Sequence, residues 1–189
     1  MQIILASSSP FRRALLGRLA LPFTAESPDL DETRRPGESP EAMVQRLSEA
    51  KAALIAARWP DAVVIGSDQA ATLDGRILGK PGGHAHAVAQ LADCSGREVT
   101  FYTGLCILKD DRRYTHLDRT RVRFRELGDA EIERYLRLEE PYQSAGSFKV
   151  EGLGISLFEA VHSEDPTALI GLPLIGLCRL LRQAGIAIP

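Results

Sequence analysis

A continuous apolar segment, Ala62-Val63-Val64-Ile65-Gly66, constrains the fold more than any other part of the chain. A short apolar run of this kind, without polar alternation, is typical of a strand that is buried on both faces of a sheet. The run Ile3–Ala6 predicts a second apolar strand. Because helical patterns alternate with these strands, we expect an α/β fold in which helices flank a mixed β-sheet.

Two serine–proline pairs predict where helices begin. Ser9 and Pro10 are placed as N-cap and first residue of one helix, and Ser39 and Pro40 begin a longer one that reaches about Arg58. The last helix is predicted from apolar residues at spacings i, i+3, i+4 and i+7, namely Leu174, Leu177, Cys178 and Leu181.

Tight turns predict two hairpins. Asp74-Gly75 is a typical two-residue hairpin turn, and Asp110-Asp111 separates two long alternating segments, Glu98–Lys109 and Arg113–Glu126. The glycine-punctuated segment Ser144–Gly154 follows a further predicted helix and precedes a short strand.

Composition excludes several classes of function. The 189 residues suit one domain, and a net charge of −2 gives no general attraction for nucleic acid. The sequence contains no apolar run near the roughly 18 residues that cross a bilayer, and its start lacks the basic region of an export signal. Three widely separated cysteines favour reduced thiols, so we expect a cytoplasmic protein.

Cations at the start of the first helix indicate an anion site. Arg12 and Arg13 follow three serines, Ser7 to Ser9, at a helix N-terminus, where positive charge is normally unfavourable. A bound phosphate, held by free N–H groups, serine hydroxyls and a guanidinium, would explain their position. The alternative is that Ser9 only caps the helix and both arginines are solvated.

Asp68 follows the central apolar strand, and ligands collect at the carboxyl ends of strands in open α/β sheets. Its carboxylate could hold a metal ion, together with Glu32, or take a proton from water. Lys80 and the glycine-rich segment that carries Lys149 and Glu151 could also face a ligand. Each of these features has a plain alternative, since loop aspartates and glycine turns are common.

Together these segments resemble the Maf family of nucleoside triphosphate pyrophosphatases along nearly the whole chain. The motifs that carry the resemblance are Leu5–Arg13, Asp31-Glu32, Lys51, Gly66-Ser67-Asp68-Gln69, Gly79-Lys80-Pro81, Ala145–Lys149 with Glu151-Gly152, and Asp165-Pro166-Thr167 to Gly171-Leu172-Pro173.

The resemblance implies a single domain over residues 1–189, with a strongly twisted sheet in two lobes around a cleft. It also implies a divalent metal, Mg²⁺ or Mn²⁺, held through Glu32 and Asp68, and Asp68 as the catalytic proton acceptor. Substrate-binding positions would be Ser7, Arg12, Arg13, Lys51 and Lys80, and specificity positions would be Phe11, Gln69 and Glu151.

Gln69 and the segment with Phe148, Lys149 and Glu151 look like the YceF-type branch, which hydrolyses 7-methyl-GTP to 7-methyl-GMP and pyrophosphate. As a physical hypothesis for this preference, N7-methylation makes guanine cationic, and the base would stack on Phe11 or Phe148 while the Glu151 carboxylate accepts from the guanine N1 and N2 donors. Two alternatives stay open: a Maf pyrophosphatase that prefers dTTP or UTP, and a non-catalytic nucleotide-binding regulator of cell division. A homodimer is also possible.

Overall fold

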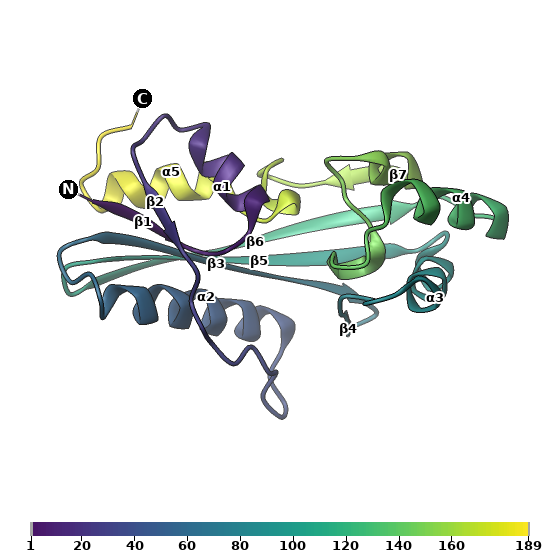
Figure 1. Ribbon diagram of the computed structural model, residues 1–189, viewed down its shortest axis with the longest axis horizontal. Helices are drawn as coiled ribbons and strands as arrows, with labels where there is room; N and C mark the ends of the chain where they lie inside the picture. The colour runs from purple at the N-terminus through teal and green to yellow at the C-terminus, as the bar shows by residue number, and fades with distance from the viewer. Residues whose placement is uncertain (1, 189) are drawn as a thin grey trace. The chain divides into compact units, whose positions relative to one another are not determined.

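The computed structural model describes residues 2–188 and contains one mixed β-sheet with helices (Figure 1). The strand order is β2-β1-β3-β5-β6-β7, with β4 paired to β3. β1 runs parallel to β2 and β3, whereas β4 is antiparallel to β3 and β7 is antiparallel to β6. This arrangement confirms the predicted α/β class with a mixed sheet.

The predicted elements appear in the predicted order, and the short strand β2 is an addition that the sequence did not indicate. The strands are β1 (Ile3–Ala6), β2 (Thr24–Glu26), β3 (Val63–Leu73), β4 (Arg76–Leu78), β5 (Glu98–Lys109), β6 (Arg112–Phe124) and β7 (Phe158–His162). The α-helices are α1 (Pro10–Gly17), α2 (Pro40–Ala56), α3 (His84–Cys94), α4 (Asp129–Glu139) and α5 (Leu174–Gln183), and three short 3₁₀ turns lie at Ala145–Ser147, Leu153–Leu157 and Ala168–Ile170.

The chain divides into two compact units. Unit 1 contains the chain up to Gln69, Tyr102–Asp118 and the chain from Asp165 onward, and unit 2 contains Ala70–Phe101 and Arg119–Glu164. The strands β3, β5 and β6 therefore continue from one unit into the other. Two units agree with the expected two lobes, while the cleft between lobes stays a prediction.

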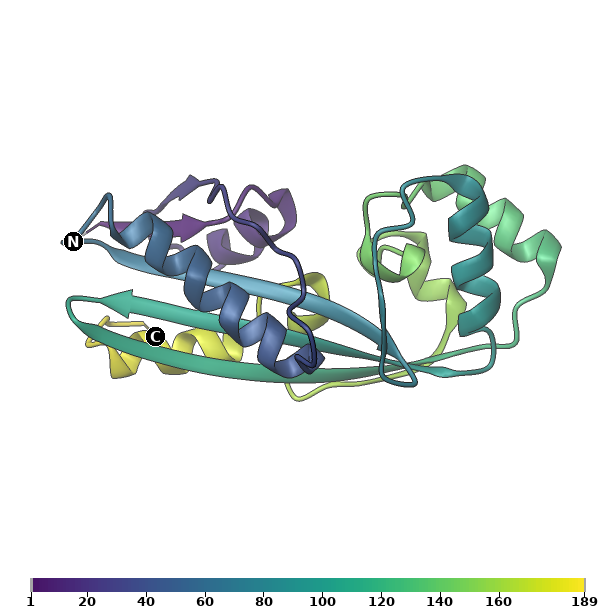
Figure 2. The same ribbon diagram turned by 90° about the horizontal axis from the view of Figure 1, so that it is seen from below.

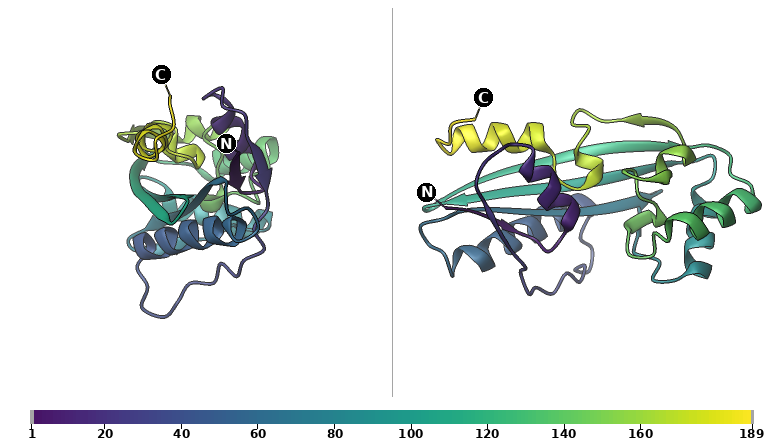
Figure 3. Two further views of the ribbon diagram at one scale, coloured as in Figure 1. Left: turned by 90° about the vertical axis from the view of Figure 1, so that its left-hand side faces the viewer. Right: turned by 45° about the horizontal axis from the view of Figure 1, so that its top comes forward.

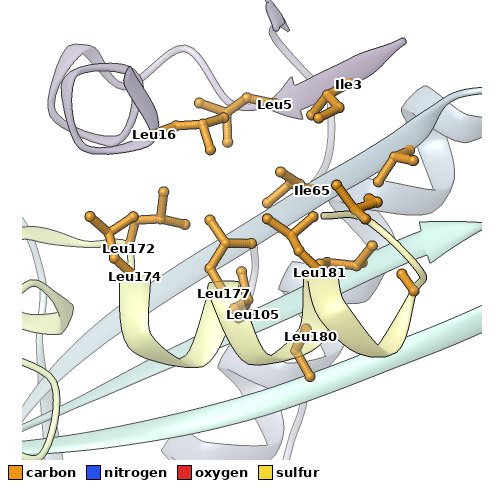
Figure 4. Close-up of a cluster of buried hydrophobic side chains, with 14 of the residues drawn as sticks. Ile3, Leu5, Leu16, Ile65, Leu105, Leu172, Leu174, Leu177, Leu180 and Leu181 are labelled. Atoms are coloured by element: carbon orange, nitrogen blue, oxygen red, sulfur yellow. The ribbon is translucent and has the colours of Figure 1, made fainter. Parts of the chain in front are cut away.

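Unit 1 has helices on both faces of its strands: α1 and α5 cover one face and α2 covers the other (Figures 1 and 3). Alternation along the strands explains this layering, since odd-numbered side chains such as Ile65 pack with α1 and α5 whereas even-numbered ones such as Val64 pack with α2. Figure 4 shows the first of these cores, with leucines of α5 directed at Ile3, Leu5 and Ile65.

Unit 2 contains α3 and α4, which pack against each other (Figure 2). Its core includes an aromatic cluster in which Phe148 contacts Phe101, Phe124 and Phe158 edge to face, at centroid distances of 5.4, 5.6 and 4.9 Å. Phe148 is only 5% exposed. The expected stacking of a base on Phe148 is therefore not supported, because the neighbouring rings already cover its surface.

Local signals explain the ends of the elements. Ser9 and Ser39 cap α1 and α2 as predicted, each accepting a hydrogen bond from a backbone N–H in the first turn. Asp74 and Gly75 have φ of 49° and 78°, which suits the predicted two-residue hairpin turn. None of the helices in residues 2–188 combines the length and apolar character that a membrane span needs.

One boundary differs from prediction. β3 does not end at Gly66 but continues to Leu73, so Asp68 lies within the strand rather than directly after it. The reason is a change of partner: pairing with β1 ends at Gly66, and antiparallel pairing with β4 occupies Ala71–Leu73. Asp68 nevertheless lies just past the carboxyl end of its parallel neighbour, β1.

Candidate active site

Asp68 is the centre of a buried charge cluster in unit 1. The ammonium of Lys51 lies 2.6 Å from Asp68 Oδ1 and 2.6 Å from Glu32 Oε1. Lys51 and Asp68 are 5% and 6% exposed, whereas the Glu32 side chain is 56% exposed. The structure thus brings together three predicted residues from α2, β3 and the loop that precedes α2.

Two glycines allow α2 to approach the sheet at this point. A Cβ at Gly66 would collide with the backbone oxygen of Ser48 and lie 2.9 Å from the Ala52 nitrogen. A Cβ at Gly104 on β5 would collide with the Val44 carbonyl of the same helix. The close approach places Lys51, between Ser48 and Ala52 in the sequence, beside the Asp68 carboxylate.

The environment of Asp68 changes its acidity. Burial raises the pKa of Asp68 above its usual value, and the nearby charges of Lys51 and Arg12 oppose the rise without cancelling it. Glu32 adds to the rise as a second negative charge. A carboxylate with a raised pKa is a better proton acceptor near neutral pH than an ordinary aspartate.

Arg12 joins this site from the first turn of α1. Its Nε donates to the Gly171 carbonyl at 2.8 Å, and its Nη1 lies 3.5 Å from Ser7 Oγ. Burial lowers the pKa of Arg12, whereas the carboxylates of Asp68 and Glu32 counteract this effect, so the three charges interact. Arginine stays protonated throughout the physiological range, and Arg12 therefore adds a permanent positive charge.

The other predicted residues at the start of α1 differ in exposure. Ser7 is buried and accepts a hydrogen bond from the Ser9 N–H at 3.1 Å. Arg13 is exposed, and the Phe11 ring is 38% exposed on the first turn. These positions leave Phe11 and Arg13 accessible to a ligand, and their roles stay predictions.

Lys80 and Glu151 belong to unit 2, where both are exposed. Lys149, in the same segment as Glu151, donates to the Glu139 carbonyl oxygen at 2.9 Å. Structural contacts therefore occupy Lys149, and the roles of Lys80 and Glu151 toward substrate stay predictions.

Gln69 makes contacts that its sequence position did not indicate. Its Nε2 donates to the carbonyls of Ala168 and Leu169 at 2.8 and 3.2 Å and to Thr103 Oγ1 at 3.0 Å. The Ser67 hydroxyl, on the other side of Asp68, lies 2.9 Å from the Gly104 carbonyl oxygen and 3.1 Å from the Gly171 carbonyl oxygen and shares its one proton between them. The available signal was strand alternation, which turns both neighbours of Asp68 to the face opposite its carboxylate.

Glu32 and Asp68 offer oxygen atoms of the kind that a divalent metal requires. Mg²⁺ and Mn²⁺ prefer oxygen ligands, and Mg²⁺ is commonly bound by one or two carboxylates together with substrate phosphates. Glu32 and Asp68 supply two carboxylates that already face one cationic group, Lys51. Within residues 2–188 no cluster of three or more histidine, cysteine, aspartate or glutamate side chains forms a metal cage. The residues therefore fit a metal that is shared with substrate phosphates.

A known family and several known proteins are similar to this chain, in agreement with the family that the sequence motifs indicate. A family model described as Maf-like protein matches residues 2–184. A protein of Xanthomonas axonopodis pv. citri (strain 306), named 7-methyl-GTP pyrophosphatase, is 58% identical over 188 residues, which cover 100% of this chain and 99% of that protein.

Proteins with the same name occur in other bacteria. The one from Cupriavidus metallidurans is 56% identical, covering 97% of this chain and 93% of its own length, and the one from Pseudomonas syringae pv. tomato is 52% identical, covering 99% and 98%. Among solved structures, the Staphylococcus aureus Ham1 protein matches with a TM-score of 0.41 and 18% identity over 68% of this chain and 73% of that one, a likeness too weak to bear on the argument.

Proposed function

Because this chain belongs to the Maf family, we propose that it is a nucleotide pyrophosphatase that hydrolyses 7-methyl-GTP to 7-methyl-GMP and pyrophosphate. One observation carries the chemistry: a buried carboxylate of raised pKa, Asp68, lies in contact with a buried lysine and interacts with Arg12. Anionic phosphates would offset the positive charge, and the carboxylate would accept a proton beside them.

The reaction needs a water molecule to attack the α-phosphorus in line with the bond to the β-phosphate. In the proposed step the water forms a new P–O bond, its proton passes to the Asp68 carboxylate, and the α–β anhydride bond breaks to release pyrophosphate. The raised pKa of Asp68 favours this transfer.

Positive groups would bind the triphosphate and stabilise the leaving pyrophosphate. Arg12, with Ser7, is positioned at the N-terminus of α1, where free N–H groups also attract anions. Lys51 lies beside Asp68, and Arg13 and Lys80 are exposed cations assigned by the family resemblance. A divalent metal held by Glu32 and Asp68 would supply further charge neutralisation of the phosphates.

The base would be selected by Phe11, Gln69 and Glu151. N7-methylation makes guanine cationic, which favours stacking on an aromatic ring and a nearby carboxylate. Phe11 has an accessible ring, whereas Phe148 is buried. Because the Gln69 amide nitrogen is bonded within unit 1, any contact of Gln69 with the base would fall to its amide oxygen.

A nucleotide panel tests the proposal. Pyrophosphate release is measured for 7-methyl-GTP, GTP, dTTP, UTP and ATP, with and without added Mg²⁺ or Mn²⁺. We expect the highest kcat/KM with 7-methyl-GTP and metal. Preference for dTTP or UTP would assign the chain to the other branch, and binding without release would support a regulator.

Glu151→Gln tests base selection in the same panel. Loss of its charge should lower kcat/KM for 7-methyl-GTP more than for GTP. Equal losses for both nucleotides would show that Glu151 does not recognise the methylated base.

A cytoplasmic location and a homodimer belong to the same proposal, and the free thiols of Cys94 and Cys106, both buried, are compatible with a reducing compartment.

A further inference from the structure

The turn 165–171, which precedes α5, has no role in the chemistry above, yet it accepts hydrogen bonds from Arg12 and from both residues that flank Asp68 on β3, Ser67 and Gln69. The Gly171 carbonyl accepts two hydrogen bonds, from Arg12 Nε at 2.8 Å and from Ser67 Oγ at 3.1 Å. Gly171 has a backbone φ of 123°, a conformation that residues other than glycine rarely adopt. The carbonyl of a residue with this positive φ therefore accepts hydrogen bonds from both Arg12 and Ser67, the residue before Asp68.

The same turn holds the residue after Asp68. Gln69 donates to the carbonyls of Ala168 and Leu169, which lie three and two residues before Gly171. Thr103 Oγ1 accepts from Gln69 and donates to the Ala168 carbonyl at 3.2 Å. Both side chains that flank Asp68 on β3 are thus bonded to consecutive parts of one turn.

Buried groups hold the turn itself in place. Asp165 is 2% exposed, and its Oδ1 accepts from the Thr167 N–H and hydroxyl at 3.1 and 2.7 Å. Its Oδ2 accepts from the N–H groups of Ile175 and Gly176 at 2.6 and 3.2 Å, in the first turn of α5. Because charge-assisted bonds to backbone N–H groups are strong, Asp165 ties the turn firmly to α5.

We propose that the turn 165–171 is a positioning element for the reaction, acting through Ser67, Gln69 and Arg12. The inference rests on the proposed function. Bonds to the residues on both sides of Asp68 fix the direction in which its carboxylate leaves β3. The bond to Arg12 Nε fixes the plane of the guanidinium, so that its remaining N–H groups have a set direction toward an anion.

Ser67→Ala is the main test, because Ser67 is fully buried and does not touch substrate. Thr72→Val is the matched control: Thr72 is on the same strand, is 5% exposed and donates to the Thr100 carbonyl at 3.1 Å. Both variants lose one buried hydroxyl, shared between the Gly104 and Gly171 carbonyls in Ser67 and bonded to one carbonyl in Thr72, so both should lower the melting temperature similarly.

Only Ser67→Ala should change catalysis. We expect kcat to fall about tenfold to a hundredfold with KM nearly unchanged and with the order of preferred nucleotides retained, because misplacement of a reacting group affects the chemical step. Thr72→Val should keep the wild-type kcat. If Ser67→Ala also keeps the wild-type kcat and only melts earlier, the turn has a purely structural role and the positioning proposal is wrong.

Asp165→Asn tests the role of the turn toward Arg12, whose Nε bonds to the Gly171 carbonyl, with inorganic pyrophosphate as the probe in isothermal titration calorimetry. Loss of the turn's anchor should weaken the binding of pyrophosphate about fivefold to tenfold, as expected for misplacing one charged anchor. Thr72→Val should bind pyrophosphate like the wild type. Equal affinity in wild type and Asp165→Asn would overturn the proposed role of the turn toward Arg12. If Asp165→Asn does not fold, Thr167→Val, which removes the hydroxyl that donates to Asp165 Oδ1, takes its place in the titration.

The two proposals fail in different ways. If the wild type releases no pyrophosphate from any nucleotide in the panel, the proposed function is wrong, and the titration alone decides the positioning proposal. If the wild type turns over but Ser67→Ala and Asp165→Asn match Thr72→Val, the function stands and the positioning proposal is overturned. A wild type that neither turns over nor binds pyrophosphate refutes both.

Discussion

The two units of this protein treat charge differently. Within residues 2–188, the buried charged residues are Lys51, Asp68, Asp118 and Asp165, and all four lie in unit 1. The buried polar residues of unit 2 are the uncharged Thr72, Thr120 and Ser147. Most ion pairs of unit 2 lie at the surface, such as Arg123–Glu159 at 2.7 Å, in which both side chains are about 60% exposed, whereas the Lys149–Glu139 pair is half-buried.

This contrast indicates that the buried charges of unit 1 lower the stability of the folded protein. Burying a charge costs free energy that pairing only partly restores, and an exposed pair contributes little in either direction. Unit 2 builds its core from packed aromatic rings and avoids that cost. Unit 1 accepts it at Asp68, whose raised pKa shows that the folded protein disfavours the charged form there. We infer that this charge is kept for chemistry.

Asp68→Asn should produce the largest effect. If Asp68 accepts the proton, its loss should lower kcat by about a thousandfold or more, within the range known for general bases. The unfolding midpoint should not fall, because a carboxylate with a raised pKa destabilises the folded state at neutral pH and Glu32 remains within 2.6 Å of Lys51. Pyrophosphate release and urea denaturation measure the two quantities.

Asp93→Asn is the control for this variant, since Asp93 forms an exposed pair with Arg76 in unit 2. Asp93→Asn should change the free energy of unfolding by no more than about 0.5 kcal/mol and should keep the wild-type kcat. A large loss of stability in Asp68→Asn with activity retained would make Asp68 a structural ion-pair residue, and the contrast between the units would lose its functional meaning.

Phe148→Ala tests the other side of the comparison. Removal of a ring that contacts three other phenylalanines should lower the free energy of unfolding by about 3–5 kcal/mol, because a large cavity remains. Leu138→Ala, at a residue that is 69% exposed on α4, should cost little. The ratio of kcat/KM for 7-methyl-GTP and GTP should not change; a changed ratio with unchanged stability would assign Phe148 to the base after all.

The sequence predicted what depends on local pattern. Apolar runs, serine–proline caps and the Asp74-Gly75 turn are set by neighbouring residues, and the structure confirms each of them. A metal site shared by Asp68 and Glu32 was considered from the residues, whereas Lys51 was expected beside them only through the family resemblance, since no local pattern relates positions on a strand, a helix and a loop.

Contacts between distant segments could not be predicted from the residues alone. Gln69 was assigned to specificity, yet its amide nitrogen bonds to carbonyls about a hundred residues later in the chain. Arg12 reaches the Gly171 carbonyl across an even longer separation. Every residue has a backbone carbonyl, so the sequence does not show which carbonyl a side chain will bond. A side chain that donates to a distant carbonyl therefore cannot be distinguished, from sequence, from one that binds a ligand.

Gly66→Ala should have a smaller effect than Phe148→Ala and should link stability to activity. An added methyl collides with the Ser48 carbonyl and forces α2 away from β3, which should cost about 1–3 kcal/mol. The same shift moves Lys51 away from Asp68, so kcat should fall as well. Gly17→Ala is the control, because a Cβ there has no neighbour within 4 Å. Full activity in Gly66→Ala would show that the site tolerates displacement of α2.

The smallest effect concerns a charge pair of unit 1 that differs from both groups above. Arg46 lies 2.6 Å from Glu38 and ties the loop that carries Glu32 to α2. The hydrogen bond from Arg46 lowers the pKa of Glu38 from 4.5 to about 2. Because the folded pKa lies below the unfolded one, the pair stabilises the protein fully above about pH 4.5, and this contribution is lost as the pH falls toward 2.

The difference in urea midpoint between wild type and Arg46→Met should therefore be constant near neutral pH and shrink as the pH falls below about 4.5. Glu38→Gln provides the control background, since it cannot titrate. There, Arg46→Met should shift the midpoint by an amount that no longer varies with pH. If the variation persists on that background, another group causes it, and the pair belongs with the surface pairs of unit 2 that add little. If it disappears, unit 1 uses charge in two ways, one that stabilises the loop carrying Glu32 and one, at Asp68, that costs stability.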